Sequence, residues 1–197
     1  MRSHELKRAK RDVRRAILAR RDAMPPDERG AAEEAIAARF LGLPELSDAR
    51  TAMAFWSFGS EVSTVPIIEG LRARGIRTAL PRIVEGALEV RAYDPGDRVR
   101  ATSFGAMEPA DGAVVPPGEV DVICTPAVAF DRRGGRVGYG GGFYDAFFPL
   151  TRDDAHRIGV AFALQVLEED LPAGHADLRV VTIVTERETI RCRDDRP

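Results

Sequence analysis

The chain alternates apolar runs of strand length with segments of helical periodicity, and this alternation restricts its possible folds more than any other feature. The runs predicted as strands span residues 51–58, 76–84, 87–94, 120–130, 156–163 and 178–186. Residues 65–75 have a helical pattern, with Thr64 as the expected cap and a proline early in the first turn. Strands joined through helices pair in parallel, and uninterrupted apolar runs indicate strands buried on both faces. We therefore predict a three-layer α/β fold in which a mainly parallel sheet has helices on both faces.

Two helices are predicted at the start of the chain. Apolar residues recur at helical spacing over 3–24, which indicates a basic amphipathic helix with Ser3 as its N-cap. Pro25 and Pro26 then interrupt the pattern, and a second helix is expected to begin with Asp27 as its cap.

Length and composition indicate one domain. The chain has 197 residues, of which 44% are apolar, and this is enough to build a substantial core. We expect a single domain over 1–197 that consists of the helix at 3–24, an α/β body over about 27–190 and a short polar tail. Within the body, residues 94–119 are rich in Pro, Gly and Asp and are expected to form a loop. A monomer is expected.

The charge balance argues against several classes of partner. The 29 Lys and Arg residues against 31 Asp and Glu residues give a net charge of −2, so the chain has no overall attraction to nucleic acid or to an anionic membrane. No apolar run approaches the roughly 20 residues of a membrane helix, and the charged N-terminus is unlike a signal peptide. We therefore expect a cytoplasmic protein that binds neither nucleic acid nor membrane.

The cysteines and histidines do not form a recognisable reactive site. Cys124 lies in an apolar run and is expected to be a core thiol, whereas Cys192 lies in the polar tail and is expected to be exposed. His4, His156 and His175 share no metal-ligand spacing and do not suggest a Ser/His or Cys/His nucleophilic pair.

The stretch GGRVGYGGGFYD at 134–145 has six glycines in its first nine positions and then turns aromatic and acidic. It lies between the strand expected at 120–130 and a short helix expected to start near Gly142, and main-chain amides in such an arrangement favour an anion. A Walker A motif needs lysine where Phe143 stands, and a dinucleotide fingerprint needs its third glycine at the same position. The stretch is therefore another kind of phosphate-binding loop, or a tight turn that packing alone requires.

Charged residues near this stretch fit nucleotide chemistry. Arg136 lies inside the loop and Asp145 just past it, which supplies a cation for phosphate oxygens and a carboxylate that can hold Mg²⁺. On the first helix, Lys10, Arg14 and Arg21 fall along one edge of the apolar stripe, so that these basic groups are held near the body of the protein. Each of these residues could instead be an ordinary surface charge, and a basic amphipathic helix could bind RNA or lipid.

Two further carboxylates are candidates for a site. Glu61 follows the strand expected at 51–58, at the strand end where open α/β sheets place their ligands. Asp177 stands in a polar turn before the last strand and is a candidate second metal ligand. The alternatives are a loop residue without a role for Glu61 and an ordinary turn residue for Asp177.

Taken together, these motifs resemble the 5-formyltetrahydrofolate cyclo-ligase family, also called 5,10-methenyltetrahydrofolate synthetases. The matching segments, in family order, are KRDVR at 10–14, EVST at 61–64, FGAMEP at 104–109, DVICTPAVAFD at 121–131, GGRVGYGGGFYDAFF at 134–148, Gln165, and LPAGHADLRVVTIVTE at 171–186. The resemblance runs from about Leu6 to Glu186, and the glycine-rich motif is its most specific part.

The resemblance implies a fold of the kind shared with sugar-phosphate isomerases and CoA transferases. It also implies an ATP- and Mg²⁺-dependent reaction that converts 5-formyltetrahydrofolate (folinate) to 5,10-methenyltetrahydrofolate and releases ADP and phosphate. In this scheme the N5-formyl oxygen attacks the γ-phosphate, and N10 then closes the ring and expels phosphate. The protein's task is to align and neutralise the reactants, so no side-chain nucleophile is needed.

The resemblance also assigns roles to individual residues. Those implied to be catalytic are Arg136, Asp145 and Lys10. Those implied to bind ATP are Lys10, Arg14, Arg136, Val137, Gly138, Tyr139, Gly140, Gly141, Gly142, Phe143 and Tyr144, with main-chain amides from Val137 to Gly142 cradling the phosphates. Those implied to bind the folate are Glu61, which would read the pterin end, and Tyr139, Gly140, Gly141, Gly142 and Phe143. Asp145 and Asp177 are implied to serve Mg²⁺, directly or through water.

The chain departs from the family pattern at two site positions. Ser63 stands where the family usually has Asp, and the missing carboxylate is expected to affect folate contacts or a helix cap. Phe143 stands where Tyr is usual, which removes one hydroxyl and keeps the aromatic surface. Two other functions stay open: a non-catalytic nucleotide-, folate- or RNA-binding module, and a relative that acts on a different substrate.

Overall fold

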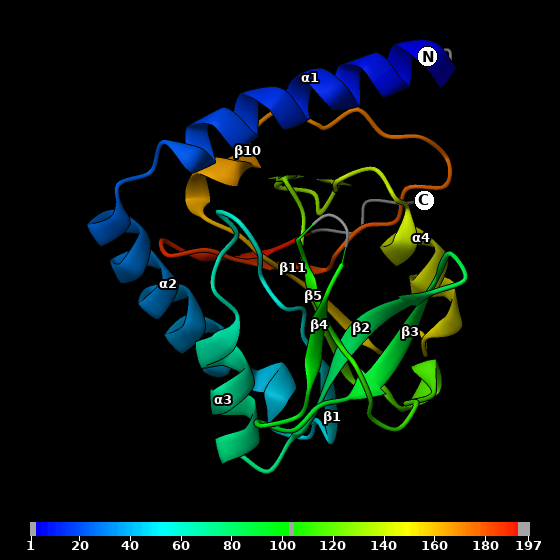
Figure 1. Ribbon diagram of the computed structural model, residues 1–197. Helices are drawn as coiled ribbons and strands as arrows, with labels where there is room; N and C mark the ends of the chain where they lie inside the picture. The colour runs from blue at the N-terminus through cyan, green and yellow to red at the C-terminus, as the bar shows by residue number, and fades with distance from the viewer. Residues whose placement is uncertain (1–2, 103–104, 193–197) are drawn as a thin grey trace.

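A seven-stranded sheet forms the centre of the computed structural model, which describes residues 3–102 and 105–192 (Figure 1). In spatial order the strands are β12 (Thr189–Arg191), β11 (Thr182–Val184), β9 (His156–Val160), β6 (Val122–Thr125), β1 (Thr51–Met53), β2 (Arg77–Val84) and β3 (Ala87–Ala92). The five strands from β11 to β2 pair in parallel, and β12 and β3 pair antiparallel at the two edges. The predicted mainly parallel sheet is therefore confirmed.

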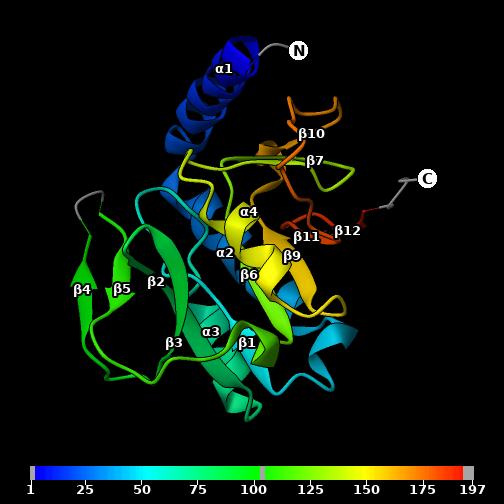
Figure 2. The same ribbon diagram turned by 90° about the vertical axis from the view of Figure 1, so that its right-hand side faces the viewer.

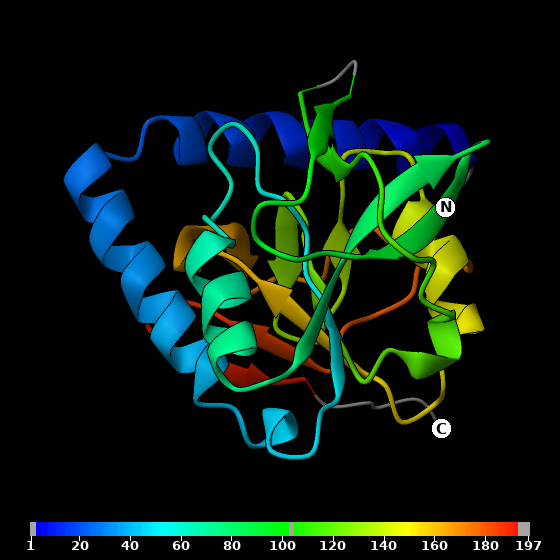
Figure 3. The same cartoon turned by 60° about the horizontal axis from the view of Figure 1, so that its bottom comes forward.

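Helices cover both faces of this sheet (Figure 3). The described helices are α1 (Ser3–Asp22), α2 (Pro26–Leu41), α3 (Val65–Ala73) and α4 (Phe143–Phe147), with 3-10 turns η1 (Pro44–Leu46), η2 (Pro117–Glu119), η3 (Phe148–Leu150) and η4 (Ala163–Gln165). Successive strand residues point to opposite faces, so that Ala52 packs with α2 and α3 whereas Met53 packs with Phe147 and Phe148 of α4 and η3. The three-layer prediction is confirmed.

A second, small sheet places α1 over the end of the central sheet. Its strands are β10 (Val166–Leu167), β7 (Ala129–Asp131) and β8 (Arg136–Val137). Ile17 of α1 is buried against Ala129 and Val137 of this sheet and against Val128, which precedes β7. Apolar packing of one helix stripe therefore holds α1 across the top of the molecule, above β10 (Figure 1).

Several expected segments differ from the structure. The strands expected at 156–163 and 178–186 shorten to β9 and β11. Only the first three residues of 51–58 form a strand, and the remainder is irregular backbone. The run at 120–130 divides into β6 and β7, which belong to different sheets; Pro126, which has no amide N–H for a strand ladder, stands between them. Residues 94–119 are not only loop, because β4 (Val99–Ala101) and β5 (Met107–Pro109) pair there antiparallel and stand to one side of the body (Figure 2).

The predicted helix caps were partly wrong. Asp27 is inside α2, because Pro25 occupies the N-cap position and Pro26, whose missing N–H costs nothing there, begins the helix. Ser3 is already helical. Thr64 does precede α3, but its hydroxyl donates to the carbonyl of Phe55 and does not cap the helix.

The thiols agree only in part with expectation. Cys124 is buried in the core, as predicted. Cys192 is half-buried and not exposed, and burial raises the pKa of its thiol to about 11. Among the described helices, none is both long and apolar enough to cross a membrane.

Gly159 of β9 tests the packing between the two sheets. A Cβ atom at this position would lie 2.6 Å from the ring of Phe130, which is fully buried in β7. We expect Gly159→Ala to lower the free energy of unfolding by about 1–3 kcal/mol, because the ring cannot move away in a packed core. Chemical denaturation measures this change.

Gly30 provides the matched control, because a Cβ atom there would meet nothing within 4 Å. Gly30→Ala in α2 is expected to raise the free energy of unfolding by about 0.5–1 kcal/mol. A Gly159→Ala protein as stable as the parent would show that β9 and β7 are not packed this closely.

Candidate active site

A cavity of about 930 Å³ lies beneath α1, where the central sheet, the glycine-rich loop and the β4–β5 hairpin meet. Phe55, Trp56, Phe58 and Glu61 reach it from the segment that follows β1, and Pro126 reaches it from the end of β6. This is the strand edge at which α/β sheets place ligands, as predicted for Glu61. Every predicted site residue except Val137 lines the cavity.

The glycine-rich loop joins β8 to α4 and forms one wall. Gly140 (φ 113°) and Gly142 (φ 70°) adopt backbone conformations that other residues rarely reach, and Gly142 is the N-cap residue of α4. At Gly141 a Cβ atom would lie 2.5 Å from the ring of Phe143. Glycine is therefore required at these three positions for the loop to turn against its own aromatic residue.

Val137 lies on the other side of this loop. Its side chain is 1% exposed and packs in the core under α1, and its carbonyl accepts a hydrogen bond from the amide of Val128. Val137 thus anchors the loop to the small sheet and does not line the cavity.

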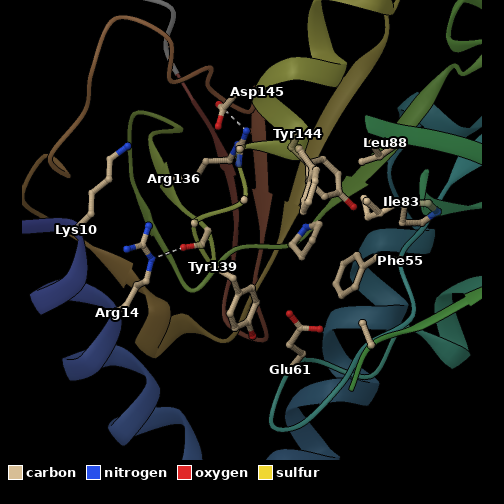
Figure 4. Close-up of a pocket in the computed structure, with 18 of the residues that line it drawn as sticks. Lys10, Arg14, Phe55, Glu61, Ile83, Leu88, Arg136, Tyr139, Tyr144 and Asp145 are labelled. Carbon is tan, nitrogen blue, oxygen red and sulfur yellow. Dashed lines mark hydrogen bonds and ion pairs between the residues drawn. The ribbon is translucent and has the colours of Figure 1, made fainter. Parts of the chain in front are cut away.

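Three cations and two carboxylates meet at one end of the cavity; Figure 4 labels the cations and Asp145. Lys10 of α1 donates to both carboxylate oxygens of Asp177, at 2.6 and 2.5 Å. Arg136 donates from Nη2 to Oδ1 of Asp145 at 2.7 Å. Arg14 donates from Nε to the carbonyl of Gly138 at 2.6 Å. The structure therefore brings together charged residues that the sequence separates by up to 167 positions.

The environment of these groups shifts two of their pKa values. Burial raises the pKa of Asp177, but the amide of Gly174 and the ammonium of Lys10 outweigh it, so the net pKa is lowered. Burial lowers the pKa of Arg136, against the opposing charge of Asp145. Its guanidinium lies 5.1 Å from the ring centre of Phe148, and its Nε has no hydrogen-bond partner among the described residues.

The other end of the cavity is apolar, and the buried carboxylate of Glu61 lies there. Its walls include Phe55, Ile83 and Leu88 (Figure 4). Glu61 is 7% exposed and accepts a hydrogen bond from the amide of Phe58 at 3.1 Å. Burial raises the pKa of Glu61, although this amide and the hydroxyl of Tyr139 oppose the change.

Sequence reasoning missed part of this apolar end. Ile83 and Leu88 belong to an antiparallel strand pair whose apolar residues read only as core. Glu108 in the FGAMEP segment also lines the cavity, and its Oε1 accepts the amide of Ile83 at 2.9 Å, which attaches the β4–β5 hairpin to β2. The signal available in the sequence for Glu108 was its place in FGAMEP, one of the segments that carry the family resemblance.

The two positions that depart from the family pattern differ in placement. Phe143 lines the cavity. Ser63 is not among the lining residues, and its amide donates to a carboxylate oxygen of Glu33 in α2 at 3.1 Å. The carboxylate that is missing at Ser63 would therefore lie near the contact between this segment and α2, and not in the cavity wall.

The acidic residues suit a metal that arrives with a ligand. Within 3–102 and 105–192, no three His, Cys, Asp or Glu residues are grouped closely enough to hold a metal ion by themselves. Asp145 and Asp177 both face the cavity. Mg²⁺ in nucleotide sites commonly takes one or two carboxylates together with phosphate oxygens, so this pair fits such an ion.

Comparison with known proteins identifies the family. The sequence model of the 5-formyltetrahydrofolate cyclo-ligase family matches residues 6–186. The chain is 33% identical to the Escherichia coli K12 5-formyltetrahydrofolate cyclo-ligase over 86% of this chain and 96% of the relative. It is also 33% identical to the Mycolicibacterium smegmatis enzyme of the same name over 93% and 96%.

A solved structure agrees with these relatives. The NMR structure of Aquifex aeolicus 5,10-methenyltetrahydrofolate synthetase superimposes with a TM-score of 0.81 at 30% identity and covers 95% of each chain. Sequence and fold thus match over nearly the same residues, and this chain is an enzyme of the 5-formyltetrahydrofolate cyclo-ligase family.

Proposed function

We propose that this enzyme converts 5-formyltetrahydrofolate to 5,10-methenyltetrahydrofolate in a reaction that consumes ATP, requires Mg²⁺ and releases ADP and phosphate. One observation carries the proposal: a single cavity joins a cationic end under a glycine-rich loop to an apolar end with a buried carboxylate. The first end suits phosphates and the second suits a flat heterocycle with N–H donors.

The cationic end would bind the nucleotide phosphates and their metal ion. Lys10, Arg14 and Arg136 supply positive charge, and the loop presents main-chain amides without side chains in the way. Asp145 and Asp177 would hold Mg²⁺, directly or through water. Once these carboxylates serve the metal ion, Lys10 and Arg136 can neutralise phosphate oxygens.

The apolar end would bind the folate. An ionised Glu61 accepts hydrogen bonds only, so it would pair with the N–H groups at the edge of the pterin ring. The aromatic residues Phe55, Tyr139 and Phe143 line the same cavity and supply surfaces on which a flat ring can stack. The formyl group would then lie between the two ends, near the nucleotide.

The reaction has two difficulties. The formyl oxygen is a poor nucleophile, and without phosphorylation it is a poor leaving group when N10 attacks the formyl carbon. Transfer of the γ-phosphoryl group to that oxygen makes it a good leaving group, and N10 can then close the ring. The contribution of this chain is to align the two substrates, exclude water and neutralise developing charge. None of these tasks requires a side-chain nucleophile.

An RNA-binding role for the basic first helix has less support from the site. Lys10 and Arg14 on the edge of α1 are turned into the cavity, where they bind Asp177 and the carbonyl of Gly138. Cations held in this way are not presented to a phosphate backbone outside the protein.

The proposal predicts a rise in absorbance at the methenyl band when pure protein is mixed with 5-formyltetrahydrofolate, ATP and Mg²⁺. The rise should need all three components, because phosphoryl transfer precedes ring closure. Controls omit each component in turn. Binding of ATP without any rise in absorbance would overturn the proposal and leave a phosphate site with another substrate.

Arg136→Ala and Asp145→Ala should each lower turnover at least about tenfold, since each removes a charge from the phosphate end. Circular dichroism and thermal melting check that the variants are folded. The matched controls are Asp12→Ala and Arg15→Ala, which break an exposed ion pair on α1 and should turn over like the parent. Parental rates in an Arg136 or Asp145 variant would remove that residue from the site.

Glu61→Gln should raise the KM for the folate at least about tenfold at neutral pH and change the KM for ATP little. Burial raises the pKa of Glu61, so the ionised form that accepts pterin hydrogen bonds is lost at a higher pH than for an exposed glutamate. In the parent, kcat/KM for the folate should therefore fall as the pH drops through this raised pKa.

The pH profile separates Glu61 from other acids. Glu61→Gln cannot titrate, so the variant should lose this acid limb, whereas the exposed control Glu169→Gln should keep it. The same acid limb in Glu61→Gln, or an unchanged KM for the folate, would contradict the pterin assignment.

A further inference from the structure

Arg21, in the last turn of α1, is an unusually buried cation. Only 2% of the residue is exposed, and a buried guanidinium is costly unless its N–H groups find acceptors. Its Nε donates to the hydroxyl of Ser60 and its Nη2 to the hydroxyl of Tyr139, both at 2.9 Å. Both acceptors are neutral, and within the described part of the chain Nη1 has no hydrogen-bond partner. Among the described residues, no direct ion pair therefore offsets the desolvation cost of the Arg21 guanidinium.

The turn that carries Glu61 is tied to both opening helices through Ser60. The Ser60 hydroxyl donates to the carboxylate of Asp22, next to Arg21. From α2, Arg29 donates to the Ser60 carbonyl at 2.6 Å and to the Arg21 carbonyl at 2.7 Å. These hydrogen bonds hold the turn against the end of α1. Contacts outside the cavity therefore help to fix the position of Glu61.

The second contact of Arg21 reaches the glycine-rich loop. The Tyr139 ring packs against Phe58 with ring centres 5.1 Å apart, and its hydroxyl end faces Glu61 (Figure 4). When the phenol oxygen accepts a hydrogen bond from Arg21, its own proton remains available for the Glu61 carboxylate. Hydrogen bonding from Tyr139 and the charge of Arg21 both favour ionised Glu61 against the effect of burial on its pKa.

We propose that Arg21 is a positioning residue for folate recognition: it fixes the Tyr139 hydroxyl and the turn at 58–61 so that the Glu61 carboxylate faces the cavity. Arg21 is not among the cavity-lining residues, so it acts through its two partners and does not touch the substrate. This inference rests on the proposed function, in which Glu61 pairs with the pterin.

The test is a double-mutant cycle on the full-length enzyme with Arg21→Met, Tyr139→Phe and the double variant. Arg21→Met should raise the KM for 5-formyltetrahydrofolate at least about tenfold while the KM for ATP stays within about twofold. If Arg21 acts through the Tyr139 hydroxyl, the double variant should be no worse than Arg21→Met by more than about twofold. The neighbouring exposed residue supplies the control, and Arg20→Met should leave both KM values unchanged.

Two further variants keep the result interpretable. If Arg21→Met does not fold, Arg21→Lys and Tyr139→Phe should each still raise the folate KM at least about threefold. Equal increases in both KM values, or additive effects in the cycle, would overturn the positioning role. A normal folate KM in Glu61→Gln would instead overturn the pterin assignment, and a raised KM in Glu61→Gln with a normal KM in Arg21→Met would overturn only the role of Arg21.

Discussion

One buried carboxylate, that of Asp131 at the end of β7, fixes the entrance to the glycine-rich loop. Its Oδ1 accepts the amides of Arg133 and Gly135 at 3.0 and 2.8 Å, and its Oδ2 accepts the amide of Leu171 at 3.0 Å. A Cβ atom at Gly135 would lie 2.3 Å from Oδ2, so the turn needs glycine where the carboxylate enters. Because Leu171 begins the segment that leads to Asp177, this one group sets both the loop and a metal-ligand candidate in place.

The charged end of the cavity is stable without a ligand because each carboxylate already has a cation. Lys10 with Asp177 and Arg136 with Asp145 form two half-buried pairs, in which attraction is screened less than at the surface. If a nucleotide bound here with its metal ion, the metal ion would replace Lys10 and Arg136 as partner of the two carboxylates. The phosphates would in turn replace the carboxylates as partners of Lys10 and Arg136. The number of buried unpaired charges then need not rise when the substrate enters.

The sequence predicted the succession of helices and strands along the chain, and most residues that line the cavity, better than it predicted how these elements pack together. Apolar runs and helical spacing are local, so the parallel sheet and its covering helices could be inferred. The division of the run around Pro126 and the pairing of β4 with β5 depend on partners elsewhere, which no local pattern contains. Arg21 shows the same limit. Its position on the helix edge predicted a cation held near the body of the protein, with an ordinary surface charge as the alternative, whereas its burial depends on contacts with Ser60 and with Tyr139, which lies 118 positions away.

The proposed reaction requires two substrates in contact, and one loop contributes to both ends of the cavity. The main chain from Gly138 to Gly142 faces the cations of α1, while the side chain of Tyr139 within the same segment faces Glu61. If the main chain of this segment binds phosphates and Glu61 binds the pterin, the same segment would position the two ligands relative to each other. Because α1 contacts the loop through Arg14 and the folate end through Arg21, two residues seven positions apart on one helix would set the spacing between the proposed nucleotide and the folate ring.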